Sequence, residues 1–210
     1  SHYLVGRIGN DPLTVDDGDY NVLDGGDDND RRFLRGSGSG NVLYGGDGQD
    51  YLSAAAHTGP GAVLYGGSGR DTLYGSQGDD WLEGGAGNDS ISGEDGVDTV
   101  FFSGLLTDYH ISFDETDGEG KWTVTDLRPG SPDGTDTVLN DVESISFGGV
   151  TFDLAYFGTE AKVADDYIGP NTTDDDLWRV FGLTPGEHTM RLVVRDDADP
   201  HSTGTRIMLN

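Results

Sequence analysis

The chain contains no cysteine, which excludes a disulfide framework and any metal or nucleophile chemistry that depends on a thiol. Basic residues are scarce: 12 lysines and arginines stand against 39 aspartates and glutamates, for a formal net charge of −27. Nucleic acids and anionic lipid surfaces need a basic face, so we expect neither as a partner. Hydrophobic residues make up only 33% of the sequence. No apolar run reaches the ~20 residues of a membrane helix, so no membrane insertion is predicted.

Recognisable catalytic motifs and rival metal motifs are also missing from the sequence. The five histidines are scattered without the spacing of a zinc site, and no G-x-S-x-G elbow is present. The acids around 27–30 and 114–120 lack the flanking helices and the twelfth-position glutamate of an EF-hand. No charged-then-apolar secretory leader opens the sequence. We therefore expect no enzyme activity in this region.

Glycine, in contrast, is abundant, with 35 residues, and it recurs with a period of nine. Residues 66–101 consist of four consecutive nonapeptides, GGSGRDTLY, GSQGDDWLE, GGAGNDSIS and GEDGVDTVF. Each has Gly at its first and fourth places, Asp at its sixth and one aliphatic residue at its eighth. A strict period of nine fits neither an α-helix nor a simple hairpin meander. It predicts a parallel β-helix solenoid, in which this glycine-aspartate repeat binds calcium.

One nonapeptide is expected to form a tight glycine turn followed by a three-residue strand whose eighth-place side chain points inward. Two nonapeptides then complete one coil of about 18 residues, so alternate turns stack on the same edge of the roll. The predicted core residues of the regular copies are Leu64, Leu73, Leu82, Ile91 and Val100. The copy at 25–35 is two residues too long, and Leu34 is its predicted inward residue.

Sorting the sixth-place residues by edge gives an uneven distribution of charge. The turns of what we call the first edge carry Asp11, Asp30, Asp50, Asp71 and Asp89. The turns of the second edge carry Asn21, Asn41, Ala62, Asp80 and Asp98. The first edge is thus an unbroken column of acids, whereas the second edge is acidic only in its last interval.

Carboxylates stacked at the inter-strand spacing of about 4.7–4.9 Å repel one another. A hard cation with six to eight oxygen ligands removes the repulsion, which describes Ca²⁺; Mg²⁺ demands a tighter octahedron and should substitute poorly. We expect roughly four to six Ca²⁺ ions, with about four on the first edge and one or two on the second. The predicted carboxylate ligands are Asp11, Asp30, Asp50, Asp71, Asp80, Asp89 and Asp98. Carbonyl donors are predicted among the first-place and third-place residues of the turns: Gly25, Asp27, Gly45, Asp47, Gly66, Ser68, Gly75, Gln77, Gly84, Ala86, Gly93 and Asp95.

The pattern changes after the last nonapeptide, where strand-like runs alternate with Asp-Gly, Pro-Gly and Gly-Gly turn signals. The predicted fold class is all-β: a right-handed parallel β-roll over 1–101 and an antiparallel β cap over 102–158. A linker or surface loop over 159–176 and a short C-terminal β segment over 177–210 are expected to follow. A cap is needed because the last coil of a solenoid otherwise exposes an apolar end. Asp126, Asp133 and Asp136 leave open a separate ion in the cap.

The nonapeptides resemble the RTX (repeats-in-toxin) family of secreted bacterial proteins over about residues 4–101. The runs LTDYHISF (106–113) and DGTDTVLNDVESISFGG (133–149) resemble the cap of C-terminal modules in serralysin-type proteases, lipases and mannuronan C5-epimerases. This resemblance implies Ca²⁺ between adjacent turns, an extracellular location and export by type I secretion machinery. It also implies a chain that folds on binding calcium outside the cell and thereby stabilises its parent protein or assists its export.

A second interpretation is a module that binds a polysaccharide or a cell surface for an extracellular enzyme. It rests on aromatic residues that flank inward positions and are predicted to form an outward stripe: Tyr44, Tyr65, Tyr74, Trp81 and Phe101. The same aromatic residues are also typical of an ordinary packing surface.

Overall fold

The computed structural model describes residues 1–154, except 115, 117 and 119. The predicted linker (159–176) and C-terminal segment (177–210) lie outside these residues. The described part is all-β apart from one 3-10 turn, η1 (Leu106–Asp108), and forms two sheets of eight strands each. Within the same part, no helix is long and apolar enough to cross a membrane.

The strand order of each sheet gives the topology. The first sheet, in spatial order, contains β1 (Tyr3–Ile8), β3 (Val22–Asp27), β5 (Val42–Gly48), β7 (Val63–Gly69), β9 (Trp81–Gly87), β11 (Thr99–Phe102), β15 (Ser144–Phe147) and β16 (Val150–Asp153). The second sheet contains β2 (Pro12–Val15), β4 (Arg31–Gly36), β6 (Tyr51–His57), β8 (Thr72–Tyr74), β10 (Ser90–Ser92), β14 (Thr135–Leu139), β13 (Lys121–Asp126) and β12 (Tyr109–Asp114).

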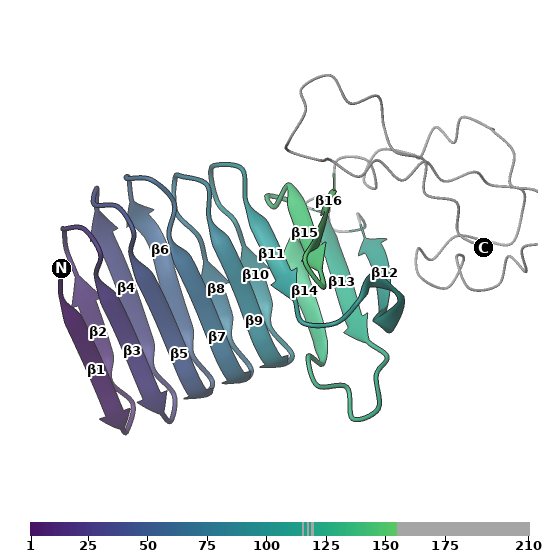
Figure 1. Ribbon diagram of the computed structural model, residues 1–210, viewed down its shortest axis with the longest axis horizontal. Helices are drawn as coiled ribbons and strands as arrows, with labels where there is room; N and C mark the ends of the chain where they lie inside the picture. Colours follow the sequence, from purple (N-terminus) through teal and green to yellow (C-terminus); the bar gives the residue numbers. More distant parts are fainter. Residues whose placement is uncertain (115, 117, 119, 155–210) are drawn as a thin grey trace, which may run out of the picture.

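From β1 to β11, consecutive strands alternate between the two sheets, and neighbours within a sheet are parallel. Figure 1 shows the resulting stack of coils, which starts at the N-terminus and ends against the antiparallel strands. Equivalent repeat positions pair in register, as in Leu43↔Leu64 and Leu64↔Leu82. The predicted parallel β-roll is therefore confirmed, as is the predicted coil of two nonapeptides.

On the first edge, the glycine turns are part of the strands rather than separate from them. β7 continues through the turn, and its Gly67 pairs with Gly46 of the preceding coil. Gly67 has a φ of +114°, and a Cβ at this position would lie closer than 3.0 Å to the Gly46 carbonyl oxygen. Glycine is required there because only a residue without a Cβ accepts both this backbone conformation and the close approach of the next coil.

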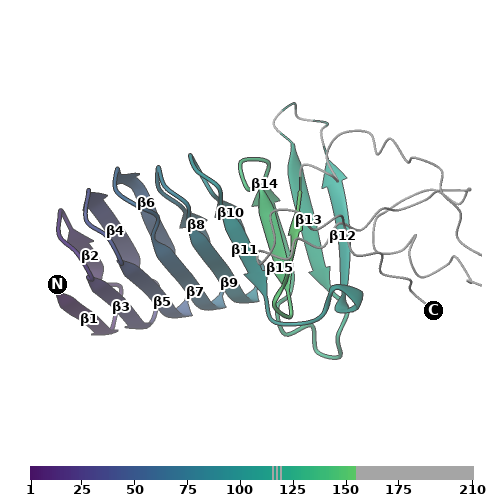
Figure 2. The same cartoon turned by 45° about the horizontal axis from the view of Figure 1, so that its top comes forward.

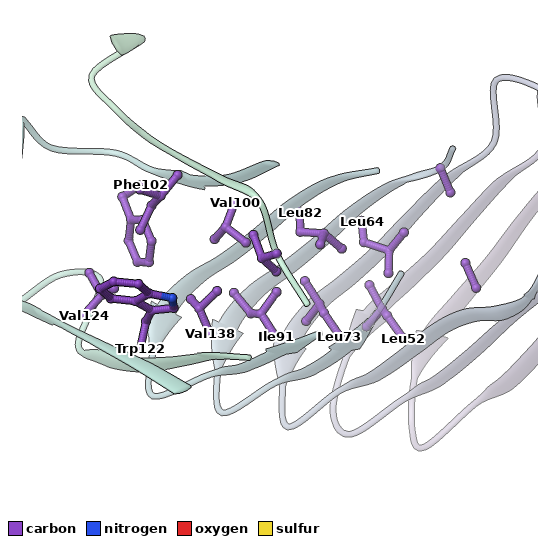
Figure 3. Close-up of a cluster of buried hydrophobic side chains, with 14 of the residues drawn as sticks. Leu52, Leu64, Leu73, Leu82, Ile91, Val100, Phe102, Trp122, Val124 and Val138 are labelled. Atoms are coloured by element: carbon purple, nitrogen blue, oxygen red, sulfur yellow. The ribbon is translucent and has the colours of Figure 1, made fainter. Parts of the chain in front are cut away.

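The core is a thin double row of aliphatic side chains between the two sheets. Leu64, Leu82 and Val100 point inward from the first sheet, and Leu73 and Ile91 point inward from the second. Each of these five predicted core residues is fully buried. Figure 3 shows the two rows facing each other and continuing into the larger side chains of the end region.

A sixth coil follows the predicted end of the roll. β14 pairs in parallel with β10 (Ile91↔Val138), and β15 pairs in parallel with β11 (Val100↔Ile145). Each of these two strands therefore has an unexpected parallel partner in the roll, in addition to the expected antiparallel partner, which is β13 for β14 and β16 for β15. The sequence DGTDTV (133–138) has the fourth-, sixth- and eighth-place residues of a nonapeptide, but residues 102–130 separate it from the regular copies.

Antiparallel pairing is confirmed for β12, β13 and β16, which pair β12–β13, β13–β14 and β15–β16. These strands cover the C-terminal end of the roll (Figure 2). Their buried aromatic side chains include Tyr109, Trp122 and Phe152, and Phe147 of the sixth coil lies with its ring centroid 4.9 Å from that of Tyr109. The end region thus supplies the bulky core that the thin coils lack.

The over-long copy at 25–35 differs from expectation. Leu34 is buried as predicted, but the eighth-place position that pairs with Leu13 and Leu52 is occupied by Arg32. The extra residues are absorbed after Phe33, where the pairing of β4 with β6 shifts register. An arginine therefore stands in a row that is aliphatic in the neighbouring coils.

Candidate metal sites at the edges of the roll

The first-edge aspartates form a continuous hydrogen-bonded column. The backbone N–H of each one donates to the Oδ1 atom of the aspartate in the next coil. The N···O distances are 2.7 Å for Asp11 to Asp30, 2.7 Å for Asp30 to Asp50, 2.8 Å for Asp50 to Asp71, 2.8 Å for Asp71 to Asp89 and 2.7 Å for Asp89 to Asp136. The column thus extends beyond the nonapeptides into the sixth coil.

The other carboxylate oxygen, Oδ2, is the unusual atom of these aspartates. In Asp30, Asp50, Asp71 and Asp89, and also in Asp98 of the second edge, it is buried and has no hydrogen-bond partner. That of Asp30 has an ion-pair partner, Arg32 Nη2 at 2.8 Å, which leaves four without a partner. A buried ionised oxygen without a partner is expensive, because it has lost its hydration and gained nothing in return. Four such atoms in equivalent places are available as ligands for a repeated cation site.

The first-place glycines show which atoms surround these oxygens. A Cβ built on Gly66 would lie closer than 3.0 Å to both Asp71 Oδ2 and the carbonyl oxygen of Gly84 in the next coil. A Cβ on Gly45 would meet Asp50 Oδ2 and Gly66 O in the same way. Carboxylate and carbonyl oxygens therefore converge on one small space per coil. Such mixed oxygen donors suit Ca²⁺.

Burial raises the pKa of these carboxyl groups. The pKa is raised to about 7 for Asp71, about 6 for Asp89 and about 8 for Asp98, in each case mainly because the charged form is desolvated. Neighbouring carboxylates add to the increase at Asp71 and Asp98. In the absence of a cation the fold therefore favours the protonated acids, and a bound cation would favour the ionised form.

The second edge is closed differently in its N-terminal half. Asn21 donates its backbone N–H and its amide to Asn41 Oδ1, both at 2.9 Å. The Asn21 and Asn41 amides also donate to the carbonyls of Gly18 and Gly38. These neutral side chains satisfy one another, as expected for positions without charge.

In the acidic part of the second edge, one aspartate has a buried Oδ2 atom without a hydrogen bond, as on the first edge. Asp80 is fully hydrogen-bonded: Oδ1 accepts from the Ala62 N–H and the Ser76 hydroxyl, and Oδ2 accepts from the Ser76 N–H. Asp98, by contrast, keeps Oδ2 without a partner, and its N–H donates to Glu143 Oε2 at 2.8 Å. Glu143 therefore has the role in the last coil that a sixth-place aspartate has in the nonapeptides, because it accepts the N–H of the preceding turn.

The predicted carbonyl donors at the first and third places of the turns differ in their exposure to solvent. The first-place glycines Gly25, Gly45, Gly66, Gly75, Gly84 and Gly93 are all buried. The third-place residues Asp27, Asp47, Ser68, Gln77, Ala86 and Asp95 are all exposed on the outer side of the turns. Which of these carbonyls bind a metal stays a prediction.

Three residues at the edges could not be identified from the sequence: Asp136, Glu143 and Arg32. Asp136 and Glu143 were missed because the intervening residues 102–130 break the nine-residue period. The half-repeat DGTDTV was the available signal for Asp136. Arg32 was missed because the two additional residues of its copy suggested a shifted register.

Two of the three cap acids that left open a separate ion, Asp126 and Asp133, pair with Arg128. Arg128 Nη2 lies 2.7 Å from Asp126 Oδ2 and 2.8 Å from Asp133 Oδ2. Hydrogen bonds from Arg128 lower the pKa of Asp126 to about 2. Asp136 instead completes the first-edge column. Among the described residues, no group of three or more His, Asp or Glu side chains could hold a metal ion.

The comparison with protein families agrees with this geometry. Residues 33–56 and 63–101 match the family model described as the RTX calcium-binding nonapeptide repeat, in four copies. These ranges contain four of the five aspartates whose buried Oδ2 atom has no hydrogen bond, Asp50, Asp71, Asp89 and Asp98. No curated protein matches the chain. The matched residues are therefore RTX calcium-binding nonapeptide repeats.

Proposed function

We propose that this region is a structural module that folds on binding Ca²⁺, rather than a catalytic one. The observation that carries the proposal is the repeated buried Oδ2 atom without a partner, next to a carbonyl oxygen of the following coil. A preformed site of this kind requires stacked coils, so binding of the metal and folding of the chain are coupled. The net charge of −27 opposes compaction until cations neutralise it.

The proposed number of ions follows from the unpartnered oxygens. Asp50, Asp71 and Asp89 give three positions on the first edge, and Asp98 gives one on the second. This distribution supports the predicted asymmetry between the edges and lies at the lower end of the predicted four to six ions. We further propose that the sixth coil contributes to the positions at Asp89 and Asp98, since Asp136 and Glu143 accept the N–H groups of these residues.

We also propose that the module works outside a bacterial cell, as part of a parent protein exported by type I secretion machinery. The match of residues 33–56 and 63–101 to the RTX calcium-binding repeat supports this location. A calcium-poor cytoplasm would keep the repeats unfolded, and external calcium would then fold them and stabilise the parent protein.

A calcium titration followed by far-ultraviolet circular dichroism tests the proposal. We expect a cooperative gain of β-structure with Ca²⁺ at neutral pH, and little or none at the same concentration of Mg²⁺, which keeps its waters and demands a tighter octahedron. A chain that is already folded in the presence of a calcium chelator, and that does not change when calcium is added, would contradict calcium-dependent folding.

Binding of a polysaccharide or cell surface is the second candidate function, and the aromatic residues favour it. Tyr44 and Tyr65 stack with ring centroids 5.0 Å apart on the first sheet, and Trp81, 56% exposed, lies 4.2 Å from Phe101. The predicted single stripe is wrong for Tyr74, which lies on the second sheet.

Replacing the exposed Trp81 by Ala tests this second function. If the stripe binds a glycan, we expect Trp81→Ala to weaken binding on a glycan array by tenfold or more, since each stacked aromatic contributes about 1–2 kcal/mol to a contact of this kind. Calcium-dependent folding should be unchanged in the variant. Absence of binding by the calcium-loaded wild-type chain across acidic and neutral polysaccharides would leave the structural role alone.

A further inference from the structure

Arg32 is the exception in the interior of the roll. Its side chain is completely buried, although its neighbours in the same row of the second sheet are Leu13 and Leu52. A buried guanidinium is stable only if anionic or carbonyl oxygens compensate for its lost hydration. The contacts of Arg32 therefore indicate why it is tolerated there.

The guanidinium reaches from the core to the first edge. Nη2 lies 2.8 Å from Asp30 Oδ2, and both side chains are fully buried. Nη1 donates to the carbonyl oxygens of Asp11 at 2.5 Å and Arg31 at 3.2 Å. Arg32 thus connects the first-edge turns of the first two coils.

The first-place glycines allow a direct comparison between coils. A Cβ on Gly25 would lie closer than 3.0 Å to Gly45 O, to Asp30 Oδ2 and to Arg32 Nη2. The equivalent Cβ on Gly45 would meet the same pair of oxygens, Gly66 O and Asp50 Oδ2, but its nearest atoms include no nitrogen. The arginine nitrogen of the second coil therefore stands beside the oxygens that face a cation position in later coils.

The opposite edge of the same coils also has no need of a cation. There the columns consist of Asn21 and Asn41, whose amides bond to each other and to backbone carbonyls. Both edges of the N-terminal coils are thus closed by groups of the protein, one by a positive charge and the other by neutral amides.

We propose that the Arg32 guanidinium replaces the calcium ion of the position beside Asp30, so that the N-terminal coils stack without metal and calcium sites begin at Asp50. This inference rests on the proposed function, because a replacement has meaning only if the other positions bind calcium. It makes the N-terminal end of the roll a metal-independent part on which the calcium-dependent coils stack.

Crystals of the wild-type chain grown with calcium, measured for anomalous scattering, give the first test. We expect ions beside Asp50, Asp71 and Asp89 and none beside Asp30. An ion beside Asp30 as well would overturn the replacement by Arg32 while leaving the proposed function intact. Absence of ions at all of these positions would overturn the proposed function, and this inference with it.

Calcium stoichiometry of matched variants gives a second test in solution. Arg32→Leu restores the residue of the neighbouring coils, and we expect it to bind one more Ca²⁺ than the wild type. The double variant Asp30→Asn/Arg32→Leu should return to the wild-type number. Arg31→Leu is the control, since Arg31 lies on the same strand with its side chain exposed and contacts the Tyr51 ring. An Arg32→Leu chain that folds in calcium with an unchanged stoichiometry would overturn the inference; if that variant fails to fold, the crystallographic positions decide.

Discussion

Replacing Asp71 by Ala is expected to remove two calcium ions and to raise the calcium concentration needed for folding by at least tenfold. Asp71 lies between Asp50 and Asp89 in the first-edge column, so the positions on both sides include its turn. The substitution removes the unpartnered Oδ2 atom and also leaves the buried N–H of Asp50 without its acceptor. The lost hydrogen bond alone costs about 1–3 kcal/mol of stability. Isothermal titration calorimetry and circular dichroism would measure the stoichiometry and the folding midpoint.

Two further variants separate charge from hydrogen bonding. Asp71→Asn retains an acceptor for the Asp50 N–H but removes the negative charge, so we expect calcium loss with a smaller decrease in stability. Asp27→Asn is the control on the same edge: its side chain is exposed, and the substitution leaves its carbonyl in place. Loss of only one ion in Asp71→Ala would contradict positions shared between stacked turns. An equal effect of Asp27→Asn would show that net charge, not the column, controls binding.

Acidification is expected to restore part of the β-structure of the calcium-free chain. The pKa of Asp71 is raised to about 7 and that of Asp98 and Asp136 to about 8, from an ordinary value of 3.8. A raised pKa means that the folded chain binds protons more tightly than the unfolded chain does. The metal-free fold is therefore stabilised as the pH falls through about 8 to 6, and it loses this stability as the pH rises through the same range.

Far-ultraviolet circular dichroism of metal-free protein from pH 8 to pH 5 would measure this effect, since pH 5 is still above the sequence pI of about 4.1. Calcium affinity should fall over the same range, because protons and calcium compete for the same oxygens. Asp98→Asn removes one of the titrating carboxyl groups, so the β-structure of the calcium-free variant should depend less on pH. A calcium-free chain that loses β-structure on acidification would refute the assignment of these raised pKa values to the folded state.

The nine-residue period was enough to predict the roll, its two edges and its inward residues. Glycine and aspartate at fixed places specify local turn geometry, and one aliphatic residue per unit specifies which side faces the core, so Leu73, Leu82 and Ile91 could be placed from sequence. The sixth coil could not be placed, because hydrogen-bonded partners such as Asp89 and Asp136 are 47 residues apart. The half-repeat DGTDTV could not be assigned to a coil, because residues 102–130 interrupt the period of nine.

The ion pairs of Arg32 and Arg128 could not be predicted from the sequence either. An insertion in a repeat gives no indication of where its additional residues go. The structure accommodates them after Phe33, which keeps Arg32 at the eighth place and in contact with Asp30. The pairing of Asp126 and Asp133 with Arg128 likewise depends on the tertiary path of the end region.

Because turns alternate between the two edges, nonapeptides can be gained or lost without mixing the two columns only in even numbers. Loss of one complete coil, such as 66–83, would bring Asp50 next to Asp89 and leave both columns continuous. Loss of a single nonapeptide would instead transfer every later turn to the opposite edge and place Asp80 in the column of Asp50. Genetic gain or loss of repeats is therefore expected to preserve this protein only in pairs, as insertions preserve a reading frame only in threes.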